Sequence, residues 1–582
     1  MTKGYNVGAA GFVGRVGGLA VALGVGAAMC SGATAWADDG GSGASSAHAG
    51  SARSASSQAT GALAKHGVAT ATTGRARPAA AVRAQSITSR ATAKATPAAT
   101  ADPSAPDVPP TDSPLELAAL AYSRRDTGVS ARPAAATTLA PEGVVQTLAA
   151  QNTALIMGPS GVPIPKPTYI QSVFDLYIAP SYPGSAPFQL DTPEGLYPIT
   201  GVKSLPLNVS VQQGIQILAA SIAEQVAAGN TATVFGYSQS AIISSLIMSQ
   251  LPQGTPVNFV LVGNEMNPNG GMLSRFPGLN LPSLGLPFYG ATPENAFPTT
   301  NYTLEYDGFA DFPRYPLNVL SVLNAGLGII FVHTKYADLT SQQVNSAIPL
   351  PTTDPSQKYY IIPTSNLPLL EPLRLLPVIG NPVADLLQPA LKVIVNLGYG
   401  DPQYGWSTNG FANQQTTFGF IPDVNWGQVA NLFVAGIGQG LHDFAADVSP
   451  GGVMWQELAA LKLPTPGPAP ALPTPTGVIS ALQTVITDVA YTISNSAAAL
   501  YAAALPTADI VNAIVTMLPA YGINLFLSGI EQALSGDVIN GLVNAIGLPI
   551  AAATGLVTTA GLIEALVLIQ AVQGFLGQET NV

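Results

Sequence analysis

Residues 231–241 read Thr-Ala-Thr-Val-Phe-Gly-Tyr-Ser-Gln-Ser-Ala. The first five are apolar or β-branched, which predicts a strand, and residues 241–251 have the spacing of a helix. Ser238 therefore lies on a turn between a strand and a helix, two residues from the small residues Gly236 and Ser240. A nucleophilic serine above the edge of a sheet has this setting, because its neighbouring backbone segments pack closely.

The flanking sequence alternates the same two kinds of element, with further strands predicted at 153–157, 257–262 and 302–306. Between the first of these and residue 231, apolar residues at helical spacing predict an amphipathic helix that ends near Gly229. Ser210 and Gln213 have the pattern of a capping box for that helix. Strands that alternate with helices predict the α/β class, a mostly parallel sheet with helices on both faces.

A serine hydroxyl needs a base to become a nucleophile, and histidine is the usual one near neutral pH. The chain has four histidines, His48, His66, His333 and His442. The first two fall in a segment of low complexity. His442 lies in an amphipathic helical context beside its own acid, Asp443, where a surface role is more common. The interpretation therefore favours His333 as the base.

The acid that orients the base is expected between the serine and the histidine, because α/β-hydrolases keep the order Ser, acid, His. Two aspartates, Asp307 and Asp311, follow the strand predicted at 302–306. Position alone does not separate them. The aspartate that is not the acid is expected to stabilise the same loop as an Asx-type turn residue.

Two donors are expected for an oxyanion hole, and Gln239 is the first candidate. Its backbone N–H is at the start of the helix after Ser238, where N–H groups and the helix dipole point toward the site. The second donor should come from a loop after an earlier strand. Ser160, in the loop 158–161, is the candidate, although an ordinary Gly/Pro turn explains that loop equally well.

The composition is poor in charge. Of 582 residues only 9% are Asp, Glu, Lys or Arg and 47% are hydrophobic, with a mean hydropathy of +0.32. A soluble protein has roughly 25% charged residues, so we expect contact with lipid, cell wall or a partner. The net charge of −11 without a basic run excludes a nucleic-acid partner.

Cysteine and histidine content limit the possible cofactors. Cys30 is the one cysteine and lies in the N-terminal segment, so disulfides, a thiol nucleophile and thiolate metal sites are not expected. A three-histidine zinc site is not expected either. We predict no metal and no cofactor.

The N-terminus has the features of a secretory signal at 1–37. Positive residues precede an apolar stretch at 16–29, and Ala35-Trp36-Ala37 predicts cleavage after Ala37. A retained membrane anchor is the alternative, but the apolar stretch is short for ~30 Å of hydrocarbon. Residues 38–136 are rich in Ala, Ser, Thr and Pro and predict a disordered stalk. The protein is thus expected to be secreted or held in the cell envelope.

Three further segments follow the stalk. A hydrolase domain is predicted at 137–448, a proline-rich linker at 449–476 and an apolar helical region at 477–582. Within the last, 548–569 has one charged residue, Glu564. It is compatible with a buried helical hairpin or with membrane contact.

Residues 153–443 resemble the PE-PPE domain of mycobacterial proteins, a cutinase-like serine hydrolase domain. The matching motifs include Met-Gly-Pro-Ser-Gly-Val-Pro at 157–163, Gly-Tyr-Ser-Gln-Ser-Ala at 236–241, Tyr-Asp-Gly-Phe-Ala-Asp-Phe-Pro at 306–313 and His-Thr-Lys-Tyr at 333–336. The resemblance implies an α/β-hydrolase fold, esterase or acyltransferase chemistry on lipid acyl esters, and a place in the cell envelope.

The resemblance also bears on the acid. Cutinase relatives place it in a Gly-x-Gly-Asp-like turn, which matches Asp311 better than Asp307. The predicted triad is therefore Ser238, Asp311 and His333, with an apolar segment at 367–397 as a lid or acyl-chain groove. The departures are the signal and stalk in place of a PE or PPE module, and the lack of disulfides. A non-catalytic envelope scaffold on the same fold is the competing function.

Overall fold

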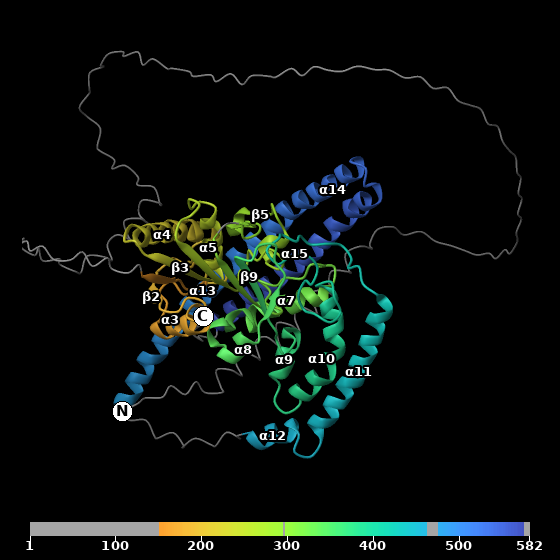
Figure 1. Ribbon diagram of the computed structural model, residues 1–582. Helices are drawn as coiled ribbons and strands as arrows, with labels where there is room; N and C mark the ends of the chain where they lie inside the picture. Colours follow the sequence, from red (N-terminus) through yellow and green to blue (C-terminus); the bar gives the residue numbers. More distant parts are fainter. Residues whose placement is uncertain (1–150, 295–296, 462–474, 576–582) are drawn as a thin grey trace, which may run out of the picture. The chain divides into compact units, whose positions relative to one another are not determined.

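The computed structural model describes residues 151–294, 297–461 and 475–575 (Figure 1). The predicted signal at 1–37, the predicted stalk at 38–136 and the middle of the predicted linker lie outside the described residues. All described residues fall within one compact unit of the chain.

A seven-stranded sheet carries the fold, in the order β2-β1-β3-β4-β7-β9-β8. Neighbouring strands are parallel except β8 and β9, which are antiparallel. The carboxyl ends of the parallel strands meet at one edge, where open α/β sheets bind their ligands. The strands are β1 (Asn152–Ile156), β2 (Ala186–Gln189), β3 (Thr231–Tyr237), β4 (Val257–Val262), β7 (Thr299–Leu304), β8 (Ile348–Leu350) and β9 (Gln357–Ile362).

Both faces of this sheet are covered, which explains the apolar strands. In β3, Val234 joins a core beneath α4 (Leu207–Ala227) and α5 (Gln239–Met248), whereas Phe235 joins a second core on the other face. Figure 1 shows α4 and α5 flanking the strands together. The second face is covered by α3 (Pro167–Val173), a π-helical turn (Phe174–Ile178), a 3-10 helix (His333–Asp338) and α8 (Ser341–Asn345).

The segment after β4 forms an excursion of short elements before β7 begins. It contains α6 (Met272–Arg275), the two-stranded hairpin β5 (Asn280–Leu281) and β6 (Leu286–Pro287), and the 3-10 turn between those strands. After β7, the helix α7 (Val319–Phe331) is capped by Asn318, whose side chain accepts from the Ser321 N–H. This helix ends two residues before His333.

Segment 367–397, expected as a lid or groove, consists of a 3-10 turn, α9 (Glu371–Arg374) and α10 (Gly380–Leu397). Leu367 and Val395 are fully buried in a third core cluster with Tyr306. Figure 1 shows α10 beside α11 (Trp426–Val448), which α12 (Val453–Ala460) follows.

The apolar C-terminal region is helical, as predicted. It consists of α13 (Pro475–Asn512), a π-helical turn (Ala513–Met517), α14 (Leu518–Leu534) and α15 (Val538–Phe575). Small residues let these helices approach closely: a Cβ on Gly529 would lie 2.4 Å from the Ala545 Cα. A Cβ on Gly326 of α7 would lie 2.1 Å from the Leu562 side chain, so α15 also packs on the hydrolase core.

Residues 548–569 are partly buried, and the expected alternative of membrane contact stays a prediction. Ala551, Ala552 and Leu556 are buried in the main core, whereas Val557 is 45% exposed. Among the described residues, three helical stretches have the length and apolar composition to cross a membrane: Val319–Asp338, Gln483–Leu534 and Val538–Gln573.

The predicted capping box is wrong. Helix α4 begins at Leu207, after Pro206, so Ser210 lies inside the helix. Its hydroxyl accepts from the Gly195 N–H at 2.8 Å, a contact between distant parts of the chain, and does not cap the helix. The residues before Ser210 belong to the helix, which therefore begins about one turn earlier than the Ser-x-x-Gln pattern predicts.

Candidate active site

The strand-to-helix turn has the backbone conformation that the motif predicts. Ser238 has φ 58° and ψ −123°, a region that residues with a side chain rarely adopt. A Cβ on Gly236 would lie 2.6 Å from the Ser240 carbonyl oxygen, so only glycine fits there. The Ser240 hydroxyl accepts from the Tyr237 N–H at 2.8 Å. The turn is thus fixed from both sides and projects the Ser238 hydroxyl over the edge of the sheet.

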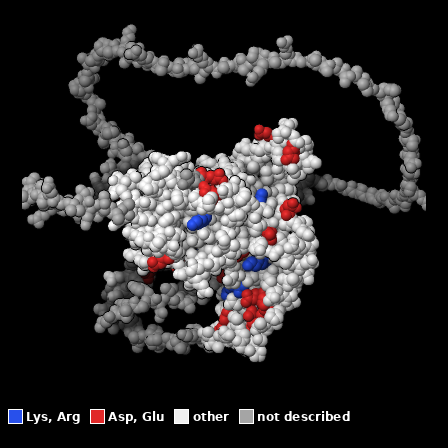
Figure 2. Space-filling model, in the orientation of Figure 1, with Lys and Arg blue, Asp and Glu red and all other residues white. Residues whose placement is uncertain are grey.

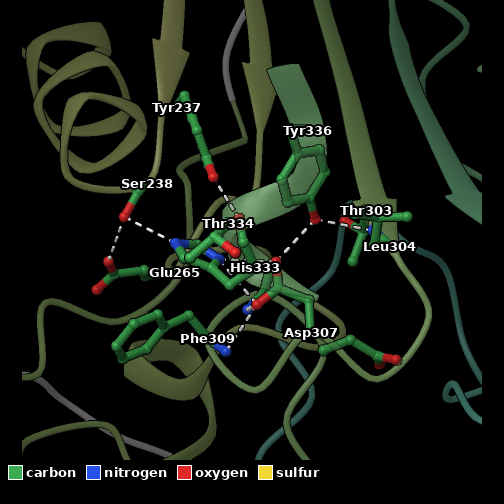
Figure 3. Close-up of polar contacts among 12 residues, drawn as sticks. Tyr237, Ser238, Glu265, Thr303, Leu304, Asp307, Phe309, His333, Thr334 and Tyr336 are labelled. Atoms are coloured by element: carbon green, nitrogen blue, oxygen red, sulfur yellow. Dashed lines mark hydrogen bonds and ion pairs between the residues drawn. The ribbon is translucent and has the colours of Figure 1, made fainter. Parts of the chain in front are cut away.

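The structure brings Ser238 and His333 together (Figure 3). The His333 Nε2 lies 2.9 Å from the Ser238 Oγ, and both side chains are buried. The Tyr237 hydroxyl donates to the His333 carbonyl, and the Phe309 ring lies edge-on to the imidazole with centroids 4.9 Å apart. Gly263, with φ +56°, leaves room: a Cβ there would lie 3.0 Å from the His333 Cε1.

Asp307 is the carboxylate on the other imidazole nitrogen. Its Oδ2 and Oδ1 lie 2.8 and 2.9 Å from the His333 Nδ1. The carboxylate also accepts from the Tyr336 hydroxyl at 2.8 Å and from the Phe309 N–H at 2.9 Å. Asp307 is fully buried, and these donors compensate for its lost hydration.

The choice of Asp311 is therefore corrected. Its Oδ2 accepts from the Tyr306 N–H at 3.0 Å, and it lies near the buried guanidinium of Arg275. The Asp311 N–H donates to the Asp307 carbonyl at 2.6 Å, so the two aspartates close one tight turn. Tyr306, with φ 67°, begins that turn, and Asp307 is the residue whose side chain reaches the imidazole. The Asx-type turn expected of the other aspartate is also made by Asp307, which accepts from the Phe309 N–H, whereas Asp311 binds back to the Tyr306 N–H.

The residues around His333 shift the pKa of its imidazole. Burial lowers the pKa of His333, but the charge of Asp307 and its hydrogen bond raise it more, and the net pKa is above the ordinary value of 6.5. A proton on Nδ1 directed at Asp307 leaves Nε2 as the acceptor for the Ser238 hydroxyl. The arrangement can remove the hydroxyl proton and stabilise the imidazolium that results.

Glu265 is a site residue that the sequence reasoning missed. The Ser238 hydroxyl lies 3.2 Å from the Glu265 Oε1, and the glutamate is 3% exposed. Burial raises its pKa to about 7. The one signal available was its position just after β4, whose carboxyl end lies beside that of β3.

A second buried carboxyl, Glu194, lies beside the loop that holds Ser160. Its carbonyl accepts from the Gly161 N–H at 2.7 Å, and its Oε1 accepts from the Thr192 hydroxyl at 2.6 Å. Burial raises its pKa to about 8, and Glu265 adds to this rise. Two buried glutamates with raised pKa values, about 7 for Glu265 and about 8 for Glu194, therefore lie near the nucleophile.

The two expected oxyanion-hole residues are in contact with each other. The Ser160 hydroxyl donates to the Gln239 Oε1 at 3.2 Å, and the Gln239 Nε2 donates to the Ser210 hydroxyl at 2.6 Å. Both polar atoms of the Gln239 side-chain amide are thus hydrogen-bonded. Its backbone N–H is in the first turn of α5, where no carbonyl of the same helix is available to it.

His442, the alternative base, lies on the exposed surface of α11. Its side chain is 80% exposed, and its Nδ1 lies 3.4 Å from the Asp443 Oδ1. The choice of His333 over His442 agrees with this geometry.

The sheet order and the serine on the turn after β3 define the α/β-hydrolase fold. The PE-PPE domain matches residues 183–400. An uncharacterized PPE family protein of Mycobacterium tuberculosis, PPE28, is 50% identical over 455 residues, which are 74% of this chain and 69% of the relative. The chain therefore belongs to the PE-PPE family.

Two other matches cover less. Esterase PE16 of Mycobacterium tuberculosis is 48% identical over 257 residues, 42% of this chain and 48% of the relative. The catalytic core domain of acetyl xylan esterase from Trichoderma reesei matches in structure with 18% identity, 34% of this chain, 98% of that chain and a TM-score of 0.23. A TM-score this low supports no conclusion, so the fold assignment rests on the sheet and the serine turn.

Proposed function

We propose that the protein is an exported serine esterase or acyltransferase that acts on lipid acyl esters. The observation that carries this proposal is the chain of contacts from the Ser238 Oγ to the His333 Nε2, 2.9 Å, and from the His333 Nδ1 to Asp307, 2.8 Å. It lies at the carboxyl edge of a mostly parallel sheet, on a turn that only a glycine at position 236 permits.

The proposed reaction has two halves. His333 takes the proton of Ser238 as the hydroxyl attacks the acyl carbonyl, and Asp307 holds the imidazole and stabilises its positive charge. His333 then gives the proton to the leaving alcohol. Water, or a second alcohol in the case of transfer, repeats the sequence on the acyl-enzyme. Exclusion of water from the site favours transfer over hydrolysis.

We assign the oxyanion hole to the backbone N–H groups of Gln239 and Ser160. The Ser160 hydroxyl holds the Gln239 side chain, which leaves the Ser160 amide as the second donor. Fixed donors of this kind stabilise the developing negative charge without reorganising during the reaction.

A lipid substrate fits the surface of the protein. On the face that Figure 2 shows, charged side chains are sparse. Large apolar residues of the C-terminal helices are exposed, including Leu534 at 84% and Ile539 at 78%. We assign the exposed apolar surface of the C-terminal helices to contact with membrane or cell-wall lipid. Flotation of the protein with phospholipid vesicles, reduced in the double variant Leu534→Glu/Ile539→Glu, tests the assignment, and unchanged flotation contradicts it.

Export through the general secretory route is part of the proposal and rests on the signal features of 1–37. Mass spectrometry of the protein from the cell envelope should give an N-terminus at Asp38. An N-terminus at residue 1 or 2 contradicts cleavage after Ala37.

The test of the chemistry uses the mature full chain and a fluorophosphonate probe, which reacts with activated serines. The parent should be labelled and should hydrolyse short acyl esters, and Ser238→Ala should lose both. His333→Ala should lose nearly all activity, whereas the matched control His442→Ala should retain it. A folded parent that is not labelled favours the non-catalytic envelope scaffold. Undiminished hydrolysis by Ser238→Ala refutes the triad.

A further inference from the structure

An apolar cavity lies between the loops of the hydrolase core and the C-terminal helices. Its empty volume is about 810 Å³, a figure that includes space open to solvent. One wall comes from residues 196–199 and from the excursion at 272–288. The other comes from the C-terminal helices, with Ile510, Ala513 and Leu556 among its residues.

The cavity wall offers no free polar side chain among the described residues. Only Tyr197 and Thr559 carry a hydroxyl there, and both hydroxyls are engaged. The Tyr197 hydroxyl donates to the Asp509 Oδ2 at 2.6 Å, and the Thr559 hydroxyl donates to the Gly555 carbonyl at 2.9 Å. A polar ligand would lose its hydration here without compensation, whereas a hydrocarbon chain loses nothing.

Two contacts connect the cavity wall to the loops of the candidate active site. Met272 lines the cavity, and its N–H donates to the Phe309 carbonyl at 2.8 Å. The Phe309 ring in turn lies against the His333 imidazole. Leu196 lines the cavity two residues after Glu194, which holds the loop of the second oxyanion donor. Residues of the cavity wall are thus joined to the candidate active site through Phe309 on one side and through the segment from Glu194 to Leu196 on the other.

We propose that this cavity holds the long acyl chain of the ester substrate, and that the C-terminal helices set the chain length the enzyme accepts. The inference rests on the proposed function and names its substrate class as long-chain acyl esters. Segment 367–397, expected as a lid or acyl-chain groove, contributes none of the described residues that line this cavity.

The expected selectivity follows from burial. Each methylene moved from water into an apolar site gains roughly fourfold in affinity, so a few methylenes denied entry cost at least tenfold. Ala513 is 3% exposed and lines the cavity, so Ala513→Phe fills part of it. Val515 lies on the same π-helical turn but is 66% exposed, which makes Val515→Phe a matched control.

The experiment compares kcat/KM for p-nitrophenyl palmitate and p-nitrophenyl butyrate on the full chain. Ala513→Phe should lower the palmitate-to-butyrate ratio at least tenfold, and Val515→Phe should leave it unchanged. A parent that hydrolyses both esters, with the same ratio in Ala513→Phe, overturns the cavity assignment alone. A parent that hydrolyses neither ester overturns the proposed function.

A binding measurement keeps the inference testable without turnover. Ser238→Ala should bind the fluorescent fatty acid cis-parinaric acid, and adding Ala513→Phe should weaken that binding at least tenfold. If Ala513→Phe does not fold, Ala560→Phe fills the cavity from a half-exposed position on α15. Equal binding by the filled and unfilled proteins overturns the inference.

Discussion

The Ser238 hydroxyl lies between two acceptors, since the Glu265 Oε1 is 3.2 Å from the same oxygen that is 2.9 Å from the His333 Nε2. A hydroxyl has one hydrogen and can donate to only one of them. A neutral Glu265 can donate to the Ser238 Oγ and leave that hydrogen to His333, whereas an ionised Glu265 competes for it. The protonation of Glu265 therefore matters to both stability and reactivity.

The first prediction concerns Glu265→Gln and pH. Burial raises the pKa of Glu265 from 4.5 to about 7, so the folded state holds a proton that the unfolded state releases between those values. The glutamate therefore lowers the free energy of unfolding as pH rises through this window, by roughly 1.4 kcal/mol per pH unit. Glu265→Gln should remove this loss, as measured by urea unfolding at pH 5 and pH 7.

The pKa of Glu194 is also raised, so in the Glu265→Gln variant Glu194 should still lower the free energy of unfolding as pH rises. The informative quantity is therefore the difference between parent and variant at each pH. A difference that is the same at pH 5 and pH 7 contradicts a neutral Glu265.

The second prediction separates the two aspartates. Asp307→Asn removes the carboxylate that holds the His333 tautomer, so kcat for short esters should fall by about 10⁴-fold. The loss of the negative charge should also lower the pKa of His333, as read from the pH profile of residual activity. Asp311→Asn should leave the pH profile unchanged and lower thermal stability, since it weakens the electrostatic attraction between Asp311 and the buried Arg275. The opposite pattern would restore Asp311 as the acid.

The third prediction assigns a positioning role to Tyr336. Its hydroxyl donates to the Asp307 Oδ2 and accepts from the Leu304 N–H, both at 2.8 Å. Tyr336→Phe removes a hydrogen bond to a charged group and the acceptor of the Leu304 N–H, so the free energy of unfolding should fall by about 2–4 kcal/mol. The kcat should fall about tenfold with little change in KM, because the carboxylate is less well held. An effect on KM alone would argue against this role.

The fourth prediction tests the turn. Gly236→Ala places a Cβ 2.6 Å from the Ser240 carbonyl oxygen, so it should cost about 1–3 kcal/mol of stability and slow fluorophosphonate labelling of Ser238. Gly438→Ala on α11 is the matched control, because a Cβ there meets nothing within 4 Å. The control should gain up to about 1 kcal/mol from helix propensity. Equal behaviour of the two variants contradicts a strained elbow.

The central fold could be predicted because its strands and helices have strong local patterns. The buried strand β3 reads as an apolar run, and Gly236 and Ser240 mark the turn after it. The edge strand β2 could not be found in the same way, since three of its four residues are exposed and it pairs on one side only. The packing of α15 on α7 depends on contacts distant in sequence that no local pattern reveals.

The residues of the candidate site also differ in whether a local sequence pattern reveals them. Ser238 and His333 could be found because the elbow motif is local and folded histidines are scarce. The acid could not, because Asp307 and Asp311 lie on one turn and only the folded structure shows which carboxylate contacts the imidazole. Glu265 belongs to no motif and becomes visible only when β3 and β4 are placed side by side.

The far wall of the apolar cavity comes from the helices at the end of the chain, whereas the serine, the acid and the base all come from its middle. During translation the residues of the candidate active site are therefore synthesised before those that close the cavity. A protein shortened before α13 would retain Ser238, Asp307 and His333 but would lose one wall of the cavity and several residues of the main hydrophobic core. On the proposals above, the reacting groups and the residues that limit acyl-chain length come from different segments of the chain, and the two segments share one hydrophobic core.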